Sequence, residues 1–230
     1  MTASEQGITE IICTVHYQHP KNFNIDINYK SVSEKIKKLE NKCKDLNIKL
    51  HPGVEVYYLP NLKKIKSNPI TCFGNGKYML IEFQTFQFPE NYEDNLYELL
   101  LSGTVPIIAH PERYRPIHHE LEIIKNLIDI GCLIQLDAGS LLGHFGKKCK
   151  AISKLMLERN MVHFMGSDAH NDKKRNFCLK HAVEICSNII GKKASVLVNE
   201  NPRKLLNGEK IIPFEVLDKK KKFGIKLFNL

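Results

Sequence analysis

The residues of this chain with the clearest chemical potential follow an apolar, strand-like run, TVPIIA, at positions 104–109. His110, Glu112 and Arg113 come directly after it, so an imidazole, a carboxylate and a guanidinium gather where a buried strand would end. Burying such groups is unfavourable unless each is paired or binds something. The stretch therefore predicts a binding site, with His110 near its centre.

Four other strand-like runs also carry or end on histidine or carboxylate side chains. These positions are His16, Glu55, Glu82, Asp168 and His170. Glu82 lies within the apolar run YMLIEF, where an unpaired charge would be strongly destabilising. Asp168 and His170 are two residues apart, so both side chains can point the same way from an extended segment. A lone histidine or strand-end carboxylate usually has only a structural role, so it is their repetition at strand ends that predicts one shared site.

Mixed histidine and carboxylate ligands suit Zn, Mn or Fe. If all six side chains converge, more than one ion could bind, activate a water and hold the oxygens of a phosphoryl group. Arg113 and Arg175 would then be forks for the non-bridging phosphate oxygens. The pattern predicts a metal-dependent phosphohydrolase. The remaining histidines are assigned structural or surface roles: His19, His51, His118, His119, His144, His163 and His181.

Strand-like and helical segments alternate along the chain, which predicts parallel β/α units. The expected strands are 8–13, 48–58, 78–83, 104–110, 132–136, 161–166 and 194–198, and the expected helices are 31–46, 93–101, 121–130, 147–159, 176–189 and 201–206. Both a barrel and an open doubly wound sheet place active sites at the carboxyl ends of such strands. Because neither GxGxxG nor GxxxxGK[ST] is present, the barrel is favoured over a nucleotide-binding open sheet.

Composition narrows the class of protein further. With 230 residues and 43% hydrophobic content, the chain can bury one large core. We expect one domain over residues 1–213 and a basic C-terminal tail over 214–230. The seven cysteines form no CxxC pair, and no apolar run approaches the ~20 residues of a membrane span. We therefore expect a cytoplasmic protein, and we interpret the net charge of +9 as a solvated basic surface that suits a phosphorylated substrate, without a nucleic-acid partner.

Three motifs resemble one family of proteins: AHPERY at 109–114, DAGSLLGHFGKK at 137–148 and GSDAHN at 166–171. PGVEVYY at 52–58, YMLIEF at 78–83 and NPRKLLNGE at 201–209 are similar to the same family, in the same order. It is the CpsB/CapC/YwqE family of bacterial protein-tyrosine phosphatases, which carry a PHP (polymerase and histidinol phosphatase) domain and are tied to capsule and exopolysaccharide synthesis. The resemblance implies an α/β fold, a PHP-type distorted (β/α)7 TIM-like barrel. It also implies up to three metal ions, usually Mn²⁺, and phosphotyrosine on a bacterial tyrosine kinase as the substrate.

The resemblance also implies roles for particular residues. By position, the metal ligands are His16, Glu55, Glu82, His110, Asp168 and His170, and the contacts of the substrate phosphate are Arg113 and Arg175. His16 matches a histidine of the family's TPHH segment, which here reads TVHY. Hydroxide activated by the metal ions, rather than a cysteine nucleophile, would attack the phosphate.

One family feature is missing from the printed sequence. The family begins with a strand that carries an HxH motif, followed by a DDG turn, and no HxH occurs in these 230 residues. We therefore expect a barrel that lacks its first strand, an exposed sheet edge beside residues 8–14, and weak or no phosphatase activity. Two alternatives stay open: a regulatory homologue that binds a kinase without cleaving phosphate, and a histidinol-phosphatase-like enzyme for small phosphoesters.

Overall fold

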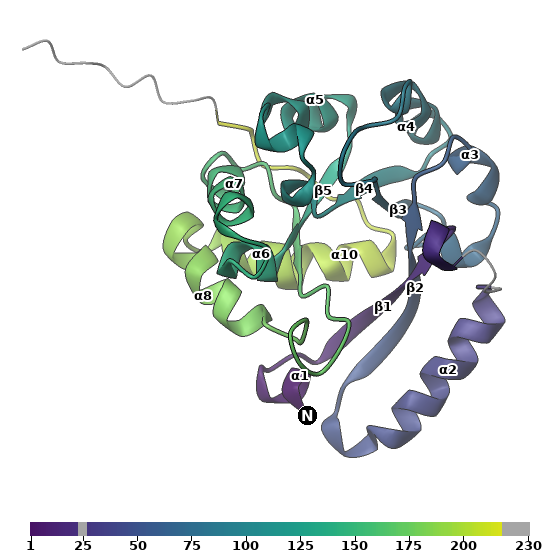
Figure 1. The fold of residues 1–230 in the computed structure, drawn as a ribbon. Helices are drawn as coiled ribbons and strands as arrows, with labels where there is room; N and C mark the ends of the chain where they lie inside the picture. The colour runs from purple at the N-terminus through teal and green to yellow at the C-terminus, as the bar shows by residue number, and fades with distance from the viewer. Residues whose placement is uncertain (23–26, 218–230) are drawn as a thin grey trace, which may run out of the picture.

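A curled sheet of six parallel strands organises the protein (Figure 1). The computed structural model describes residues 1–22 and 27–217. The strands lie side by side in chain order: β1 (Glu10–Tyr17), β2 (Lys49–Tyr57), β3 (Tyr78–Glu82), β4 (Val105–Ala109), β5 (Leu133–Asp137) and β6 (Phe164–Gly166). Since the strands are parallel, all their carboxyl ends meet at one edge of the sheet. That edge is where the predicted site residues lie.

Helices connect the strands and lie around the sheet (Figure 1). In chain order they are α1 (Thr2–Glu5), α2 (Tyr29–Lys42), α3 (Leu62–Ile65), α4 (Tyr92–Leu101), α5 (Glu122–Ile130), α6 (Ala138–Leu142), α7 (Lys147–Glu158), α8 (Leu179–Ile190), α9 (Lys193–Ser195) and α10 (Asn201–Asn207). Local chemistry sets several of their ends. The side chain of Asn28 accepts the Ser31 N–H in a capping box that begins α2, and Gly131, at φ 115°, ends α5.

Both faces of the sheet are buried, as expected for parallel strands covered on two sides. Along β3, Met79 and Ile81 belong to the larger apolar cluster, which the helices cover. Tyr78 and Leu80 point to the opposite, concave face and join a second cluster that Leu205 of α10 completes. The alternation has a direct consequence for the site, because every second residue of each strand projects into the concave side.

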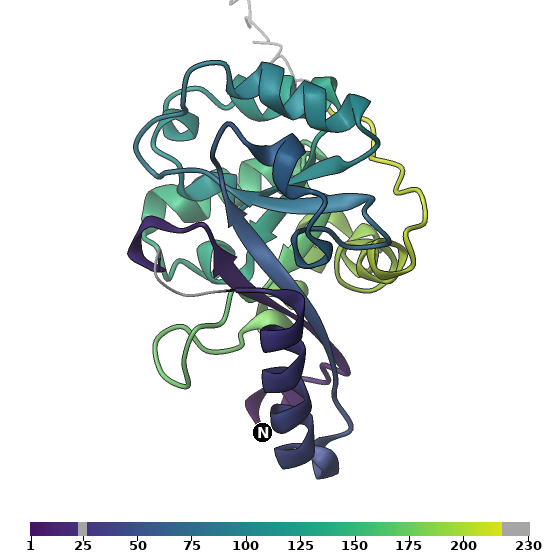
Figure 2. The ribbon, with the colours of Figure 1, turned by 90° about the vertical axis from the view of Figure 1, so that its right-hand side faces the viewer.

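The long β1–β2 pair sets the position of the first two site residues. The two strands pair from Glu10 with Lys49 to Tyr17 with Val56, and α2 lies beside them and extends with them away from the rest of the molecule (Figure 2). The sequence pattern predicts a first strand that ends at residue 13. In the structure β1 continues to Tyr17, so His16 lies within the strand and not after it.

The predicted seventh strand, at 194–198, is wrong. This segment is helical, and α9, a π-helix at Val196–Glu200 and α10 follow one another directly. Its buried residues explain why, since Ala194, Leu197, Asn201 and Leu205 recur at helical spacing, three or four residues apart. Helical periodicity outweighed the β-branched composition that had suggested a strand. The sheet is therefore a curled half-barrel of six strands over the described residues.

The region that the sequence analysis assigned to the tail begins with residues that touch the domain. Phe214 and Val216 pack against the larger apolar cluster, and the Leu217 N–H donates to the carbonyl of Arg159. The rest of the predicted tail, 218–230, lies outside the described residues. Within the described ranges, no helix is long and apolar enough to cross a membrane.

The buried His163 should make the free energy of unfolding depend on pH. Its Nδ1 accepts the Ile134 N–H at 3.0 Å, and burial lowers its pKa to about 4. Since the unfolded-state pKa is about 6.5, the unfolded state binds the proton more tightly, and stability present above pH 6.5 is lost as the pH falls towards 4. Between pH 7.5 and pH 5 we expect urea unfolding at constant ionic strength, with chelator present, to show a loss of about 2 kcal/mol from this residue.

His163→Asn should remove that part of the pH dependence, whatever it does to stability at pH 7.5. His181→Asn, at an exposed histidine of α8, is the matched control for the same substitution outside the core. Equal pH dependence in the wild type and His163→Asn would contradict the prediction.

Candidate metal and phosphate site

The register of β1 and β2 brings the first two candidate ligands together. His16 is the direct partner of Glu55 in the parallel ladder, so both side chains project from the same face. On β2, Val54 and Val56 pack into the larger apolar cluster, which turns Glu55 towards the concave side. His16 Nε2 lies 3.3 Å from Glu55 Oε2.

Glu55 is the hub of this cluster. It is 4% exposed, and its second oxygen, Oε1, lies 3.3 Å from Nε2 of the buried His110. Burial alone would raise the pKa of Glu55, but hydrogen bonds with His110 and His16 hold it well below its ordinary range. Burial alone would lower the pKa of His110, yet the hydrogen bond with Glu55 and the negative charges of Glu55 and Asp168 together raise it to about 9. The carboxylate and the two imidazoles form one tightly coupled group.

Glu82 supplies the second carboxylate of the cluster. Its Oε1 lies 3.5 Å from His110 Nε2. Burial, and then the negative charge of Glu55, raise the pKa of Glu82. Its Oε2 is buried and has no hydrogen-bond partner among the described residues, and the same is true of His110 Nδ1. Two neighbouring carboxylates, one buried and one half-buried with a buried oxygen that has no partner, are costly unless a cation joins them.

The donor atoms fit a divalent metal ion. One atom each from His16, Glu55 and Glu82 lie within 4.8 Å of one another. Nitrogen and carboxylate oxygen donors in this combination suit Mn, Fe or Zn. The structure brings His110 into the same group, since its Nε2 approaches both carboxylates.

A second group forms where β6 ends. Asp168 accepts from Arg113 Nη1 at 2.7 Å, and Arg175 Nη2 donates to the same carboxylate oxygen, Oδ2. Arg113 also lies 3.5 Å from Oδ2 of Asp137, the last residue of β5. The two guanidiniums thus converge on one oxyanion, which is the arrangement that a phosphate would require.

Two residues of the site hold backbone conformations that are unusual for non-glycine residues. His110 has φ 34° and Asp168 has φ 44°, both in the left-handed region. His110 directly follows β4 and Asp168 lies two residues after β6, so the chain turns sharply beyond each strand at the sheet edge. Such strain persists only where the surrounding structure imposes it, and it concentrates at functional sites.

Buried contacts hold the β3 and β4 ends in place. The Tyr114 hydroxyl donates to the carbonyl of Ala109 at 2.6 Å and accepts the Phe83 N–H at 3.0 Å. The residue before His110 and the residue after Glu82 are therefore tied to one buried ring. This link fixes the spacing between two of the candidate ligands.

His170 and His19 connect the two groups. The ring of His170 lies 5.5 Å from that of His16, between centroids, and its Nδ1 lies 2.9 Å from the backbone oxygen of Asp168. His19, which the sequence analysis assigned to a structural or surface role, stacks on His16 at 4.9 Å. Its position three residues after His16 is the one signal that could have marked it.

Asp137 also belongs to the site, although it is not among the candidate ligands predicted from the sequence. This carboxylate is 2% exposed, and burial and the charge of Asp168 raise its pKa. It accepts the Gly139 N–H at 2.7 Å, which begins α6, and it faces Arg113. It ends a strand as the other candidates do, so the same strand-end criterion would have found it.

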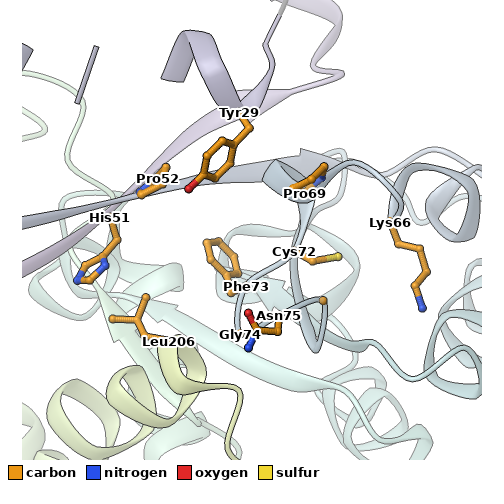
Figure 3. Close-up of a pocket in the computed structure, with 11 residues that line it drawn as sticks. Tyr29, His51, Pro52, Lys66, Pro69, Cys72, Phe73, Gly74, Asn75 and Leu206 are labelled. Carbon is orange, nitrogen blue, oxygen red and sulfur yellow. The ribbon is translucent and has the colours of Figure 1, made fainter. Parts of the chain in front are cut away.

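Of the cavities at the two ends of the sheet, the one at the carboxyl edge has the reactive groups. It measures about 420 Å³ and reaches from the apolar concave side to Glu55, Asp168 and His170. A second cavity of about 490 Å³ lies towards the amino ends, between β2, α10 and the loop before β3 (Figure 3). Its two basic side chains are engaged elsewhere: His51 pairs with Glu10, and Lys66 donates to Ser102. The carboxyl edge is therefore the candidate site.

Comparison with known proteins agrees with this geometry. The family model described as "Capsular polysaccharide synthesis, CpsB/CapC" matches residues 1–207. The tyrosine-protein phosphatase YwqE of Bacillus subtilis (strain 168) is 32% identical over 225 residues, which cover 96% of this chain and 88% of YwqE. The tyrosine-protein phosphatase CpsB of Streptococcus pneumoniae is 33% identical over 213 residues, covering 87% of this chain and 85% of CpsB.

A solved structure extends the likeness to three dimensions. It comes from work on YwqE from Bacillus subtilis and CpsB from Streptococcus pneumoniae, described as unique metal-dependent tyrosine phosphatases. It superposes with a TM-score of 0.86 at 31% identity and covers 95% of this chain and 89% of its own. With a family model that spans most of the sequence, and relatives this similar over nearly their whole length, the chain belongs to the CpsB/CapC family.

Proposed function

We propose that this protein is a metal-dependent protein-tyrosine phosphatase that acts on phosphotyrosine of a bacterial tyrosine kinase in capsule or exopolysaccharide synthesis. The observation that carries the proposal is that a histidine–carboxylate cluster and two converging guanidiniums share one edge of the sheet. The first group suits divalent cations and the second suits a phosphoryl group. The names of the relatives support tyrosine phosphate as the substrate.

His16, Glu55 and Glu82 would hold the first metal ion, with His110, Asp168 and His170 available to this ion or to one or two others. We infer Mn²⁺ from the family resemblance. A divalent ion bound here would add positive charge beside the phosphoryl oxygens and activate a water for attack on phosphorus. The fold would then be a PHP-type distorted barrel, with the six described strands as part of its wall.

The residues of the chain itself orient the substrate. Arg113 and Arg175 would bind the non-bridging oxygens in the place where they now converge on Asp168 Oδ2. Asp137, behind Arg113, keeps that guanidinium directed at the sheet edge. The buried Glu55 keeps the two imidazoles of His16 and His110 facing the same point. Binding in this geometry lowers the barrier mainly by positioning and by stabilising charge.

Turnover of a phosphotyrosine peptide tests the proposal. We expect hydrolysis that depends on Mn²⁺ and stops with chelator, because His16, Glu55 and Glu82 would hold the ion. Asp168→Asn should reduce turnover by at least about 100-fold, since the carboxylate lies between both groups of the site. Asp172→Asn, at an exposed position in the same loop, is the matched control and should behave as the wild type.

The same assay separates the alternatives. Peptide binding without any turnover, unchanged by Asp168→Asn, would favour the regulatory module and contradict the enzyme. Faster turnover of histidinol phosphate than of the peptide would favour the small-molecule phosphoesterase.

A further inference from the structure

Phe145 lies beside Arg113 and Arg175, the two arginines that would bind phosphate, although neither the sequence motifs nor the family resemblance assigns it a role. The guanidinium carbon of Arg113 lies 4.5 Å from the centre of its ring, and that of Arg175 lies 5.7 Å away. Arginine stacks on aromatic rings through its planar face and keeps its N–H groups free at the edge. A single ring therefore contacts both of the side chains that would bind phosphate.

The loop that carries Phe145 folds back on itself, so that the ring lies beside the site. Gly143 and Gly146 frame it with φ 98° and φ 94°, a conformation that other residues rarely adopt. The His144 N–H donates to the Gly139 carbonyl at 2.9 Å, which folds the loop back over the first turn of α6. A Cβ at Gly139 would lie 3.3 Å from Phe145 Cε2, so the missing side chain lets the ring lie against the backbone.

Core packing does not explain this ring. Phe145 is only half-buried and belongs to neither of the two apolar clusters of the described residues. The loop therefore holds Phe145 beside the two arginines for a reason other than core packing. The ring offers the guanidiniums an uncharged surface that an anion does not displace.

This property matters because the two arginines share a single charged contact. Both donate to Asp168 Oδ2, and Arg113 has a longer second contact with Asp137. If a substrate phosphate takes the place of Asp168 between the guanidiniums, that anchor is lost at the moment when orientation is needed. The contact with Phe145 remains, since it does not involve the carboxylate of Asp168.

We propose that Phe145 is a positioning residue that holds Arg113 and Arg175 in the geometry that binds the phosphoryl group. This inference rests on the proposed function for its role in turnover, but it concerns phosphate binding and can be tested without turnover. It predicts that the aromatic face, and not the apolar volume, is what matters at position 145.

The experiment compares Phe145→Leu with Phe145→Trp. Binding of inorganic phosphate is measured by calorimetry on the full chain, and the Michaelis constant and kcat are measured with the phosphotyrosine peptide. Phe145→Leu should weaken phosphate binding and raise the Michaelis constant roughly tenfold, the size of one or two guanidinium–ring contacts. Phe145→Trp should stay within about twofold of the wild type, because indole keeps the π-face.

Phe86→Leu is the matched control, since Phe86 lies 4.4 Å from the guanidinium carbon of Arg115 and is exposed. It should change neither constant. A double-mutant cycle between Phe145→Leu and Arg175→Ala should show that the two changes are not additive. Thermal unfolding of each variant separates lost positioning from lost folding.

The outcomes separate the inference from the proposed function. Phosphate binding that weakens in Phe145→Leu and is retained in Phe145→Trp supports the inference even if the wild type hydrolyses no peptide. Equal phosphate binding in the wild type, Phe145→Leu and Phe145→Trp overturns it, even if peptide turnover is robust. Additive effects in the double-mutant cycle would also overturn it.

Discussion

Glu55→Gln is expected to remove most divalent metal binding, with an affinity loss of at least about 100-fold. Even second-shell partners of metal ligands are worth 10- to 100-fold in affinity, and Glu55 contacts His16 through one oxygen and His110 through the other. Glutamine keeps the size of the side chain but replaces one acceptor with a donor and removes the charge. Both imidazoles would lose their common partner, and Glu82 would be the only carboxylate left in the cluster.

Calorimetry with Mn²⁺ after dialysis against chelator measures the effect directly. Glu10→Gln is a close control because Glu10 also pairs with a histidine across β1 and β2, His51, at the opposite end of the same ladder. That variant should bind Mn²⁺ as the wild type does. If Glu55→Gln also binds metal normally, the cluster at His16, Glu55 and Glu82 is not the metal site.

Arg113→Ala should lower kcat/KM for a phosphotyrosine peptide by about 100- to 1,000-fold, in line with the loss of one pre-organised donor to a developing oxyanion. The substitution removes one of the two guanidiniums that would bind phosphate. It leaves the buried Asp137 without its guanidinium partner and Asp168 paired with Arg175 alone. Breaking a buried ion pair on one side is strongly destabilising, so unfolding must be measured alongside activity.

Arg113→Lys separates charge from geometry. Lysine keeps the positive charge near both carboxylates, and stability should recover, but its ammonium cannot make the two parallel hydrogen bonds of a guanidinium. We expect only partial recovery of kcat/KM. Arg115→Ala, two residues along and exposed, is the control and should retain turnover. Full activity in Arg113→Lys would show that Arg113 acts as a point charge and not as a fork.

Much of the fold followed from local patterns. Four of the six strands lie within the segments predicted for them, and β5 extends one residue past its segment, because their apolar runs are short and bounded by turns, as parallel strands are. Segment 194–198 failed because composition was weighed above periodicity, although Ala194, Leu197 and Asn201 already followed helical spacing. The closed barrel was expected from the family resemblance, and its closure depends on contacts between strands far apart in the chain.

For the candidate site, too, some features followed from the sequence and others only from the tertiary structure. The sequence by itself determined which side chains end strands, since a histidine or carboxylate in an apolar run is visible from its neighbours, as at Glu82 and His110. Only the tertiary structure decided which of these side chains meet. The β1–β2 register placed His16 opposite Glu55, and the curl of the sheet let Arg113 and Arg175 reach the same oxygen of Asp168. The tertiary structure also places Asp137 and Phe145 beside Arg113. The physical reason is that periodicity records which face of an element is buried, whereas the distance between two strand ends depends on strand order, register and twist, which no local segment encodes.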